Sequence, residues 1–243
     1  MGTENRTGLF SLGLFVAIGL ALAGYFVGQT LYNAKVAINT AEAKGLAERR
    51  VMADHADWTV SFKVAGKSRS DLPELYQQAE QQQQTIVALL KENGFDDSEI
   101  DMGILDYGSY EYRDEDQALV DEEHYLNGTI TVSTDQVKMI KSARANVNKL
   151  LAQGVDIQSF APQYRFTKLN EIKPDMLREA TKNARLAANE FATNAGVNVG
   201  GIRNARQGSF YVRDAGEEYG GDTAKIEKDV RVVTTITFYL TEK

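Results

Sequence analysis

The chain has 243 residues, with 34 acidic against 27 basic side chains, a net charge of −7 and a pI near 5.0. This balance excludes a nucleic-acid binder, which needs a basic surface, and it argues against a polybasic grip on anionic lipid. The chain has no cysteine and only two histidines, which excludes disulfides and thiol chemistry and leaves few soft metal ligands.

The first feature along the chain is an uncharged stretch between Arg6 and Lys35. We predict a transmembrane helix over residues 9–32, because about 20 apolar residues cross the roughly 30 Å of bilayer hydrocarbon. A cleaved secretory signal is the alternative, and Ala-Leu-Ala at residues 21–23 offers a cleavage site before Gly24. The apolar run continues beyond that site, so we expect a retained anchor.

Two further features of this segment concern association and orientation. Gly24 and Gly28 form a G-x-x-x-G pair that lets two helices approach closely, although glycine is also common in membrane spans. More basic residues follow the span than precede it, so the positive-inside rule places the large C-terminal part in the cytoplasm. That rule weakens for long translocated domains, and the orientation therefore stays open.

The chain divides by pattern into four parts. Residues 1–8 form an N-terminal tail before the span. The alanine-rich residues 33–48 form a juxtamembrane stalk that continues the helix until Gly45 weakens or ends it. Residues 49–243 have the patterning of a folded domain, large enough for its own core.

This domain is predicted to be α+β, with an antiparallel sheet covered by about three long helices. Alternating apolar and β-branched residues predict strands, and apolar stripes with capping residues predict helices. The predicted strands are 58–64, 100–112, 125–133, 160–169, 199–212 and 230–240, and the predicted helices are 71–94, 135–154 and 173–195. Each helix ends in a glycine, at Gly94, Gly154 and Gly196, which tolerates the positive φ of a helix-to-strand turn.

Two local features carry specific expectations. Gly128 interrupts a predicted strand and is expected to mark a bulge or tight bend. The third helix has Pro174 in its first turn. Its expected buried stripe consists of Ala180, Ala184, Ala187, Ala188, Phe191 and Ala195.

The search for functional residues yields an interface rather than a catalytic site. Tyr107, Tyr110 and Tyr112 are candidate interface residues, because tyrosine is favoured at protein contacts. The acidic residues within 113–123 offer oxygen ligands for a hard cation but lack calcium-loop spacing, so a solvated loop is expected. His55 and His124 show no paired ligand spacing, and we expect both to be structural. No catalytic, cofactor-binding or metal-binding residue is assigned, and no enzymatic activity is expected.

The order of these elements resembles one known family. Residues 44–54 (Lys-Gly-Leu-Ala-Glu-Arg-Arg-Val-Met-Ala-Asp), followed by Trp58, resemble the opening of bacterial SIMPL-domain proteins. The strand 125–133, the alanine-striped helix before Gly196 and the closing strand 230–240 are also similar. The resemblance extends from about residue 44 to residue 241. The order of these elements along the chain is more specific than any one motif.

The resemblance implies a bacterial envelope protein, often periplasmic, that forms large ring-like homo-oligomers and is linked to envelope or oxidative stress tolerance. It supplies no catalytic residue. We therefore expect a non-enzymatic, single-pass inner-membrane protein with a periplasmic domain, although a cytoplasmic-facing domain stays open. Its expected partners are other copies of itself and the bilayer, the latter through residues 9–32. A ligand-binding or cation-binding sensor module is the alternative, and an unrecognised hydrolase using the available carboxylates is the least favoured.

Overall fold

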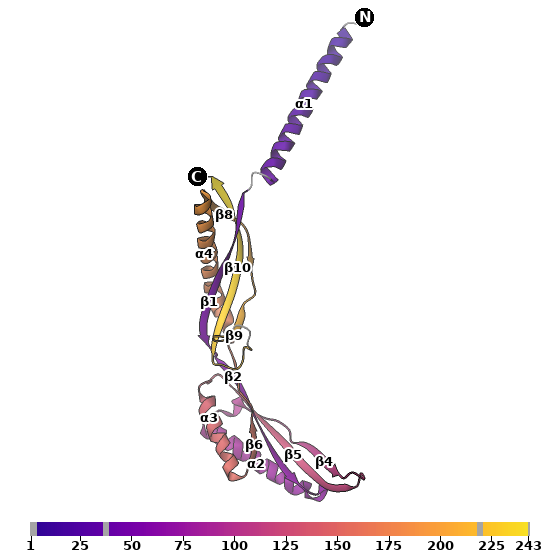
Figure 1. Ribbon diagram of the computed structural model, residues 1–243, viewed down its shortest axis with the longest axis vertical. Helices are drawn as coiled ribbons and strands as arrows, with labels where there is room; N and C mark the ends of the chain where they lie inside the picture. Colours follow the sequence, from indigo (N-terminus) through magenta and orange to yellow (C-terminus); the bar gives the residue numbers. More distant parts are fainter. Residues whose placement is uncertain (1–3, 36–38, 218–220, 243) are drawn as a thin grey trace. The chain divides into compact units, whose positions relative to one another are not determined.

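The protein is described by a computed structural model that covers residues 4–35, 39–217 and 221–242 (Figure 1). Contacts between Cα atoms divide the chain into two compact units, each of which is described by itself. Unit 1 comprises residues 1–47, 175–209 and 232–243, and unit 2 comprises residues 48–174 and 210–231. The long elements β1, α4 and β10 each contribute residues to both units.

The N-terminal element is the helix α1 (Glu4–Lys35). Its segment Gly8–Tyr32 is long and apolar enough to cross a membrane, and none of it is buried against the rest of the described chain. This segment includes the predicted span at residues 9–32. A secretory signal would pass the same test of length and composition, so the helix is a possible anchor by these two criteria.

Unit 1 holds three strands of a four-stranded sheet, with one helix packed on them (Figure 1). Its strand order is β1-β10-β8, formed by β1 (Thr40–Met52), β10 (Glu227–Glu242) and β8 (Val197–Gln207), and the helix is α4 (Leu169–Ala195). Strands β8 and β10 are antiparallel. The small core contains Ala43, Ala184, Ala188, Ile236 and Phe238, so α4 approaches the sheet through alanines.

The prediction of a helical stalk is wrong for residues 40–48, because Thr40–Met52 is a strand, and residues 36–38 of the predicted stalk lie outside the described part of the chain. Ala43, Gly45 and Ala47 alternate with exposed residues and face α4. A Cβ atom at Gly45 would lie 1.8 Å from the carbonyl oxygen of Ala180. The glycine therefore permits the close approach of β1 to α4. Burial alternates at every second residue, which is the pattern of a strand rather than a helix.

Unit 2 contains a six-stranded antiparallel sheet. Four strands follow the order β3-β5-β2-β6, while β4 pairs with β5 and β7 pairs with β2. The strands are β2 (His55–Gly66), β3 (Ile100–Met102), β4 (Asp106–Arg113), β5 (Leu119–Thr134), β6 (Asp156–Ser159) and β7 (Gln163–Arg165). Outside this sheet, β9 (Tyr211–Asp214) pairs with the beginning of β10.

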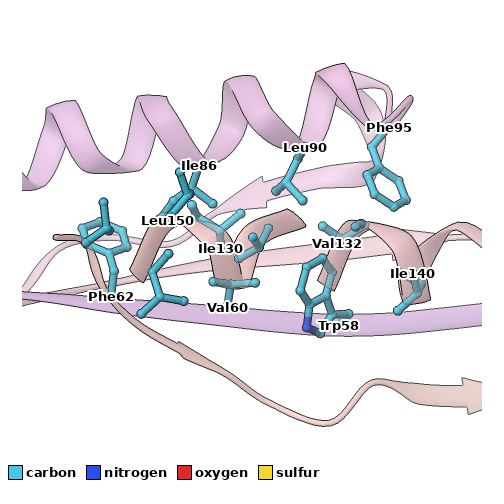
Figure 2. Close-up of a cluster of buried hydrophobic side chains, with 14 of the residues drawn as sticks. Trp58, Val60, Phe62, Ile86, Leu90, Phe95, Ile130, Val132, Ile140 and Leu150 are labelled. Carbon is cyan, nitrogen blue, oxygen red and sulfur yellow. The ribbon is translucent and has the colours of Figure 1, made fainter. Parts of the chain in front are cut away.

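The main hydrophobic core lies between this sheet and its helices (Figure 2). The helices are α2 (Leu72–Glu92), α3 (Met139–Val147) and the short 3-10 elements η1 (Arg69–Asp71), η2 (Asp97–Glu99) and η3 (Asn148–Gln153). Trp58, Val60 and Phe62 of β2 point to the same side as Ile130 and Val132 of β5. The helices cover this face with Ile86, Leu90, Ile140 and Leu150. The other face of the sheet carries mainly polar residues.

Several strands and helices begin or end at residues other than those predicted. The predicted strand 100–112 is two strands separated at Gly103, and 160–169 is mostly loop before α4 begins at Leu169. Pro174 therefore lies inside α4 rather than in its first turn. The second predicted helix becomes α3 followed by the 3-10 element η3. The glycine prediction is confirmed, because Gly94, Gly154 and Gly196 all have positive φ, at 94°, 85° and 72°.

Two packing predictions are wrong. Gly128 pairs in regular register with Phe62, and a Cβ atom there would lie 2.2 Å from the Phe62 ring, so the glycine makes room for an aromatic ring rather than a bulge. Phe191 is 64% exposed. The buried stripe of α4 instead repeats every four residues, at Met176, Ala180, Ala184, Ala188 and Ala192.

Candidate functional site

The three candidate interface tyrosines lie on one free sheet edge. Within the described ranges β4 pairs only with β5, so its second edge carries no partner strand. Tyr107, Tyr110 and Tyr112 are each about half exposed, at 49%, 55% and 51%. Met102 and Ile104 precede them and are 57% and 81% exposed. We call these five residues the β4 edge.

Alternation along β4 places the tyrosines on both faces of the sheet. The Tyr107 hydroxyl lies 2.8 Å from Nδ1 of His124, and the two rings are nearly parallel, with their centroids 6.0 Å apart. Tyr110 stacks on Tyr125 of β5 at 5.2 Å between centroids. These contacts hold the rings in place while leaving an exposed surface on each.

The polar face beside Tyr110 is organised around Tyr125. The Lys63 ammonium lies 4.5 Å from the centroid of the Tyr125 ring and forms an ion pair with Glu123. The hydrogen bond to Glu123 raises the pKa of Lys63, and the hydrogen bond with Tyr110 raises the pKa of Tyr125. Gly108 lies under the Tyr125 ring, where a Cβ atom would come within 2.4 Å. Cross-strand contacts between β2, β4 and β5 thus hold Tyr110 of the β4 edge in place.

The predicted acidic loop is shorter than expected, because β5 begins at Leu119 and takes Asp121, Glu122 and Glu123 into the sheet. The Asp114 carboxylate accepts the backbone N–H groups of the turn itself. Other carboxylates pair with Arg113, Lys63 and Lys67. Among the described residues no three His, Asp or Glu side chains are grouped to hold a metal ion.

The predicted helix contact lies at Gly24 and Gly28. Both glycines lie in α1, and a Cβ atom at either position would meet no heavy atom within 4 Å. A single chain shows no helix packed against this pair, and the contact stays a prediction.

The structure groups polar residues that the sequence analysis kept apart. Pairing of β2 with β5 sets Asp57 opposite Ser133, and pairing of β2 with β7 sets His55 opposite Arg165. The imidazole Nδ1 of His55 lies 2.8 Å from Oδ1 of Asp135, and its Nε2 lies 3.2 Å from Oγ of Ser133. We call His55, Asp57, Ser133, Asp135 and Arg165 the His55 cluster.

Two further contacts complete the His55 cluster. The Ser133 hydroxyl donates to Oδ1 of Asp57 at 2.9 Å, and Arg165 forms an ion pair with the other carboxylate oxygen of Asp57. The sequence gives no sign of this arrangement, because 78 positions separate His55 from Ser133. No motif marks them, and only the strand register brings them together.

A second polar group is fully buried and joins β9 to β10. Nζ of Lys228 lies 2.5 Å from Oδ1 of Asp214, and the two side chains are 0% and 1% exposed. Burial alone would raise the pKa of Asp214. Hydrogen bonds from Lys228 and from the backbone N–H groups of Lys225 and Ala224 outweigh burial and lower this pKa below its usual value. The ion pair therefore links β9 to β10 in the protein interior, where solvent does not reach it.

Comparison with protein-family models matches residues 42–238 to the model described as SIMPL, a protein of unknown function (DUF541). The chain belongs to the SIMPL family. The match begins in β1 and ends in β10, so the SIMPL domain draws on both units. It confirms the family resemblance, and the structure confirms the predicted α+β fold with its antiparallel sheet. No curated protein matches the chain.

Proposed function

We propose that this SIMPL protein is a membrane-anchored assembly protein whose copies associate through the β4 edge into a ring-like homo-oligomer. Residues 9–32 hold each copy in the inner membrane of a bacterium, with the SIMPL domain in the periplasm. The family resemblance links such an assembly to envelope or oxidative stress tolerance. Assembly requires no chemical step, and no enzymatic activity forms part of this function.

The observation that carries the proposal is the composition of the β4 edge. An unpaired strand edge presents free N–H and C=O groups that pair readily with another chain. Soluble proteins usually protect such edges with charge, proline or a covering element. Here Ile104 is 81% exposed, and three tyrosines and a methionine share the edge. Large apolar and aromatic side chains of this kind are enriched at protein interfaces.

The occupant proposed for this edge is the same edge of a second copy of the chain. In an antiparallel pairing with Tyr110 opposite its symmetry mate, Tyr107 of one copy faces Arg113 of the other. A guanidinium beside an aromatic face is favourable, and Glu111 falls opposite Ser109 rather than opposite another acid. The contact is self-complementary, as a two-fold interface requires.

A ring needs a second contact in addition to this two-fold pair. Strand β8 offers one, because it is the terminal strand of the β1-β10-β8 sheet and residues 201–207 are exposed. Anchoring in one bilayer plane raises the local concentration of the domains, which strengthens weak contacts of both kinds.

The test is the mass of the full-length particle in mild detergent, measured by light scattering or native mass spectrometry. We expect a discrete oligomer for the native chain and smaller species for the double variant Ile104→Lys, Tyr110→Lys. The matched control is Tyr76→Lys, since Tyr76 is also half exposed but lies on α2. A native chain that is a monodisperse monomer at micromolar concentration contradicts the proposal.

A further inference from the structure

The His55 cluster has the connectivity of a nucleophile with its base. Ser133 Oγ lies 3.2 Å from Nε2 of His55, and Nδ1 of the same ring lies 2.8 Å from Asp135. A serine, an imidazole and a carboxylate joined in this order are the groups that activate a serine hydroxyl in acyl transfer. All three residues lie within unit 2, on strands β2 and β5 or directly after β5.

We propose that Ser133 is an acylatable nucleophile that reacts with small carboxylic esters, with His55 as its general base and Asp135 as a positioning residue. The Asp135 carboxylate fixes the tautomer in which Nδ1 of His55 carries the proton. Nε2, which lies 3.2 Å from Ser133 Oγ and 3.5 Å from Oδ1 of Asp57, then has the lone pair that accepts the proton of the Ser133 hydroxyl. Asp135 is 86% exposed, so its contact with His55 is not needed to fill the core.

Asp57 competes with His55 for the same proton. Ser133 Oγ lies 2.9 Å from Asp57 Oδ1, a shorter contact than the one with His55. Arg165 pairs with Asp57 and withdraws negative charge from its carboxylate, which weakens it as an acceptor. The same guanidinium pairs with the carboxylate that accepts from Ser133, and in the proposed reaction it stabilises negative charge on the attacked carbonyl oxygen.

An open pocket on the same face of the sheet shares Asp57 with the His55 cluster. Its volume is about 380 Å³, and it is lined by Asp57, Thr59, Phe160, Ala161 and Gln163. Phe160 is 46% exposed and provides apolar surface for a short acyl chain. The pocket therefore fits a small, uncharged ester in which the alcohol portion remains in solvent.

The proposed reaction consumes only the ester and one molecule of solvent water. Ser133 Oγ forms a bond to the carbonyl carbon while its proton passes to Nε2 of His55. The bond from that carbon to the alcohol oxygen then breaks, and the alcohol leaves with the proton from His55. Water, deprotonated by His55, releases the acyl group as a carboxylic acid and restores Ser133.

The test uses the full-length protein in mild detergent with p-nitrophenyl acetate and, separately, an alkyl fluorophosphonate. Peptide mass spectrometry should locate both adducts on Ser133, and Ser133→Ala should abolish them. Because general base catalysis contributes about 10²–10⁴-fold, His55→Ala should slow labelling by about 100-fold or more. Asp135→Asn should slow labelling, and Asp135→Glu should restore part of the native rate, a rescue that a purely structural role would not give.

Two control variants separate the alternatives. Ser61→Ala should label as the native chain does, because Ser61 lies on the same sheet face and its hydroxyl donates to the Gln158 carbonyl oxygen, at 3.4 Å, rather than to an imidazole. Asp57→Asn keeps the shape of the pocket but removes the negative charge of the competing acceptor, and it should raise the rate of labelling. The proposal is overturned if Ser133 labels no faster than Ser61, or if Asp57→Asn abolishes labelling while His55→Ala does not.

Discussion

Among single residues, Lys228 and Asp214 form a fully buried ion pair in unit 2. Lys228 also donates to the carbonyl oxygen of Asp222 at 2.7 Å, and Asp214 accepts two backbone N–H groups. The two charges are therefore compensated and hydrogen-bonded, as buried charges must be. Removal of Lys228 alone would leave an uncompensated buried carboxylate, a change that costs about 3–5 kcal/mol in comparable cases.

The lowered pKa of Asp214 predicts loss of stability in acid. The stability that this group contributes is complete above the unfolded-state pKa of about 3.9, and it is lost as the pH falls through the lower folded-state pKa. Urea unfolding at pH 7 and pH 3 should therefore show a smaller acid-induced loss for Asp214→Asn than for the native chain. Trp58, the single tryptophan, is buried in the same unit and reports the transition.

Asp101→Asn is the control for this experiment, because Asp101 is exposed on β3. It should keep the native acid sensitivity. An Asp214→Asn variant that loses as much stability in acid as the native chain would show that another carboxylate controls the transition.

At the scale of elements, the contact of β1 with α4 depends on small side chains. Gly45 lies opposite Ala180, and the Asn183 side-chain amide donates to the carbonyl oxygen of Leu46 at 2.8 Å. The backbone of the strand thus lies close to the backbone of the helix. Alanines at every fourth position of α4 keep this distance short along the helix.

Gly45→Val should open this contact. A side chain at residue 45 would meet backbone atoms of Ala180 and Ala184, which cannot move aside as a flexible side chain does. Overpacking of this kind costs about 1–3 kcal/mol or more. Hydrogen–deuterium exchange of peptides within 176–192 should become faster. Gly201→Val on β8, where a Cβ atom meets nothing within 4 Å, should not change it, and unchanged exchange in Gly45→Val would refute the argument.

The elements also show which patterns the sequence reveals. Helix ends at Gly94, Gly154 and Gly196 were predictable, because glycine tolerates a positive φ whatever its surroundings. The strand at 40–52 was not, because Ala and Gly belong equally to a helical stripe and to a close-packed strand. Phe191 was misplaced for a related reason: a face built from alanines leaves no room for a ring against the sheet.

At the scale of the whole molecule, α1 decides whether the SIMPL domain stays at the membrane. A retained anchor predicts that the full-length chain remains in the membrane fraction after an alkaline carbonate wash. A chain that begins at residue 39 should then be released in soluble form. Mass spectrometry of the N-terminal peptide provides the independent check, and a mature chain that begins at Gly24 would identify a cleaved signal instead.

The sequence alone determined the apolar N-terminal helix, the α+β class, the glycine-terminated helices and the family. These depend on local properties, namely side-chain hydropathy, its period along the chain and backbone freedom. The sequence pointed to the tyrosines of β4, whereas their position on a free sheet edge and the grouping of the His55 cluster follow from the tertiary structure. Each depends on which strands pair and in what register, and that choice is made by packing between residues far apart in the chain.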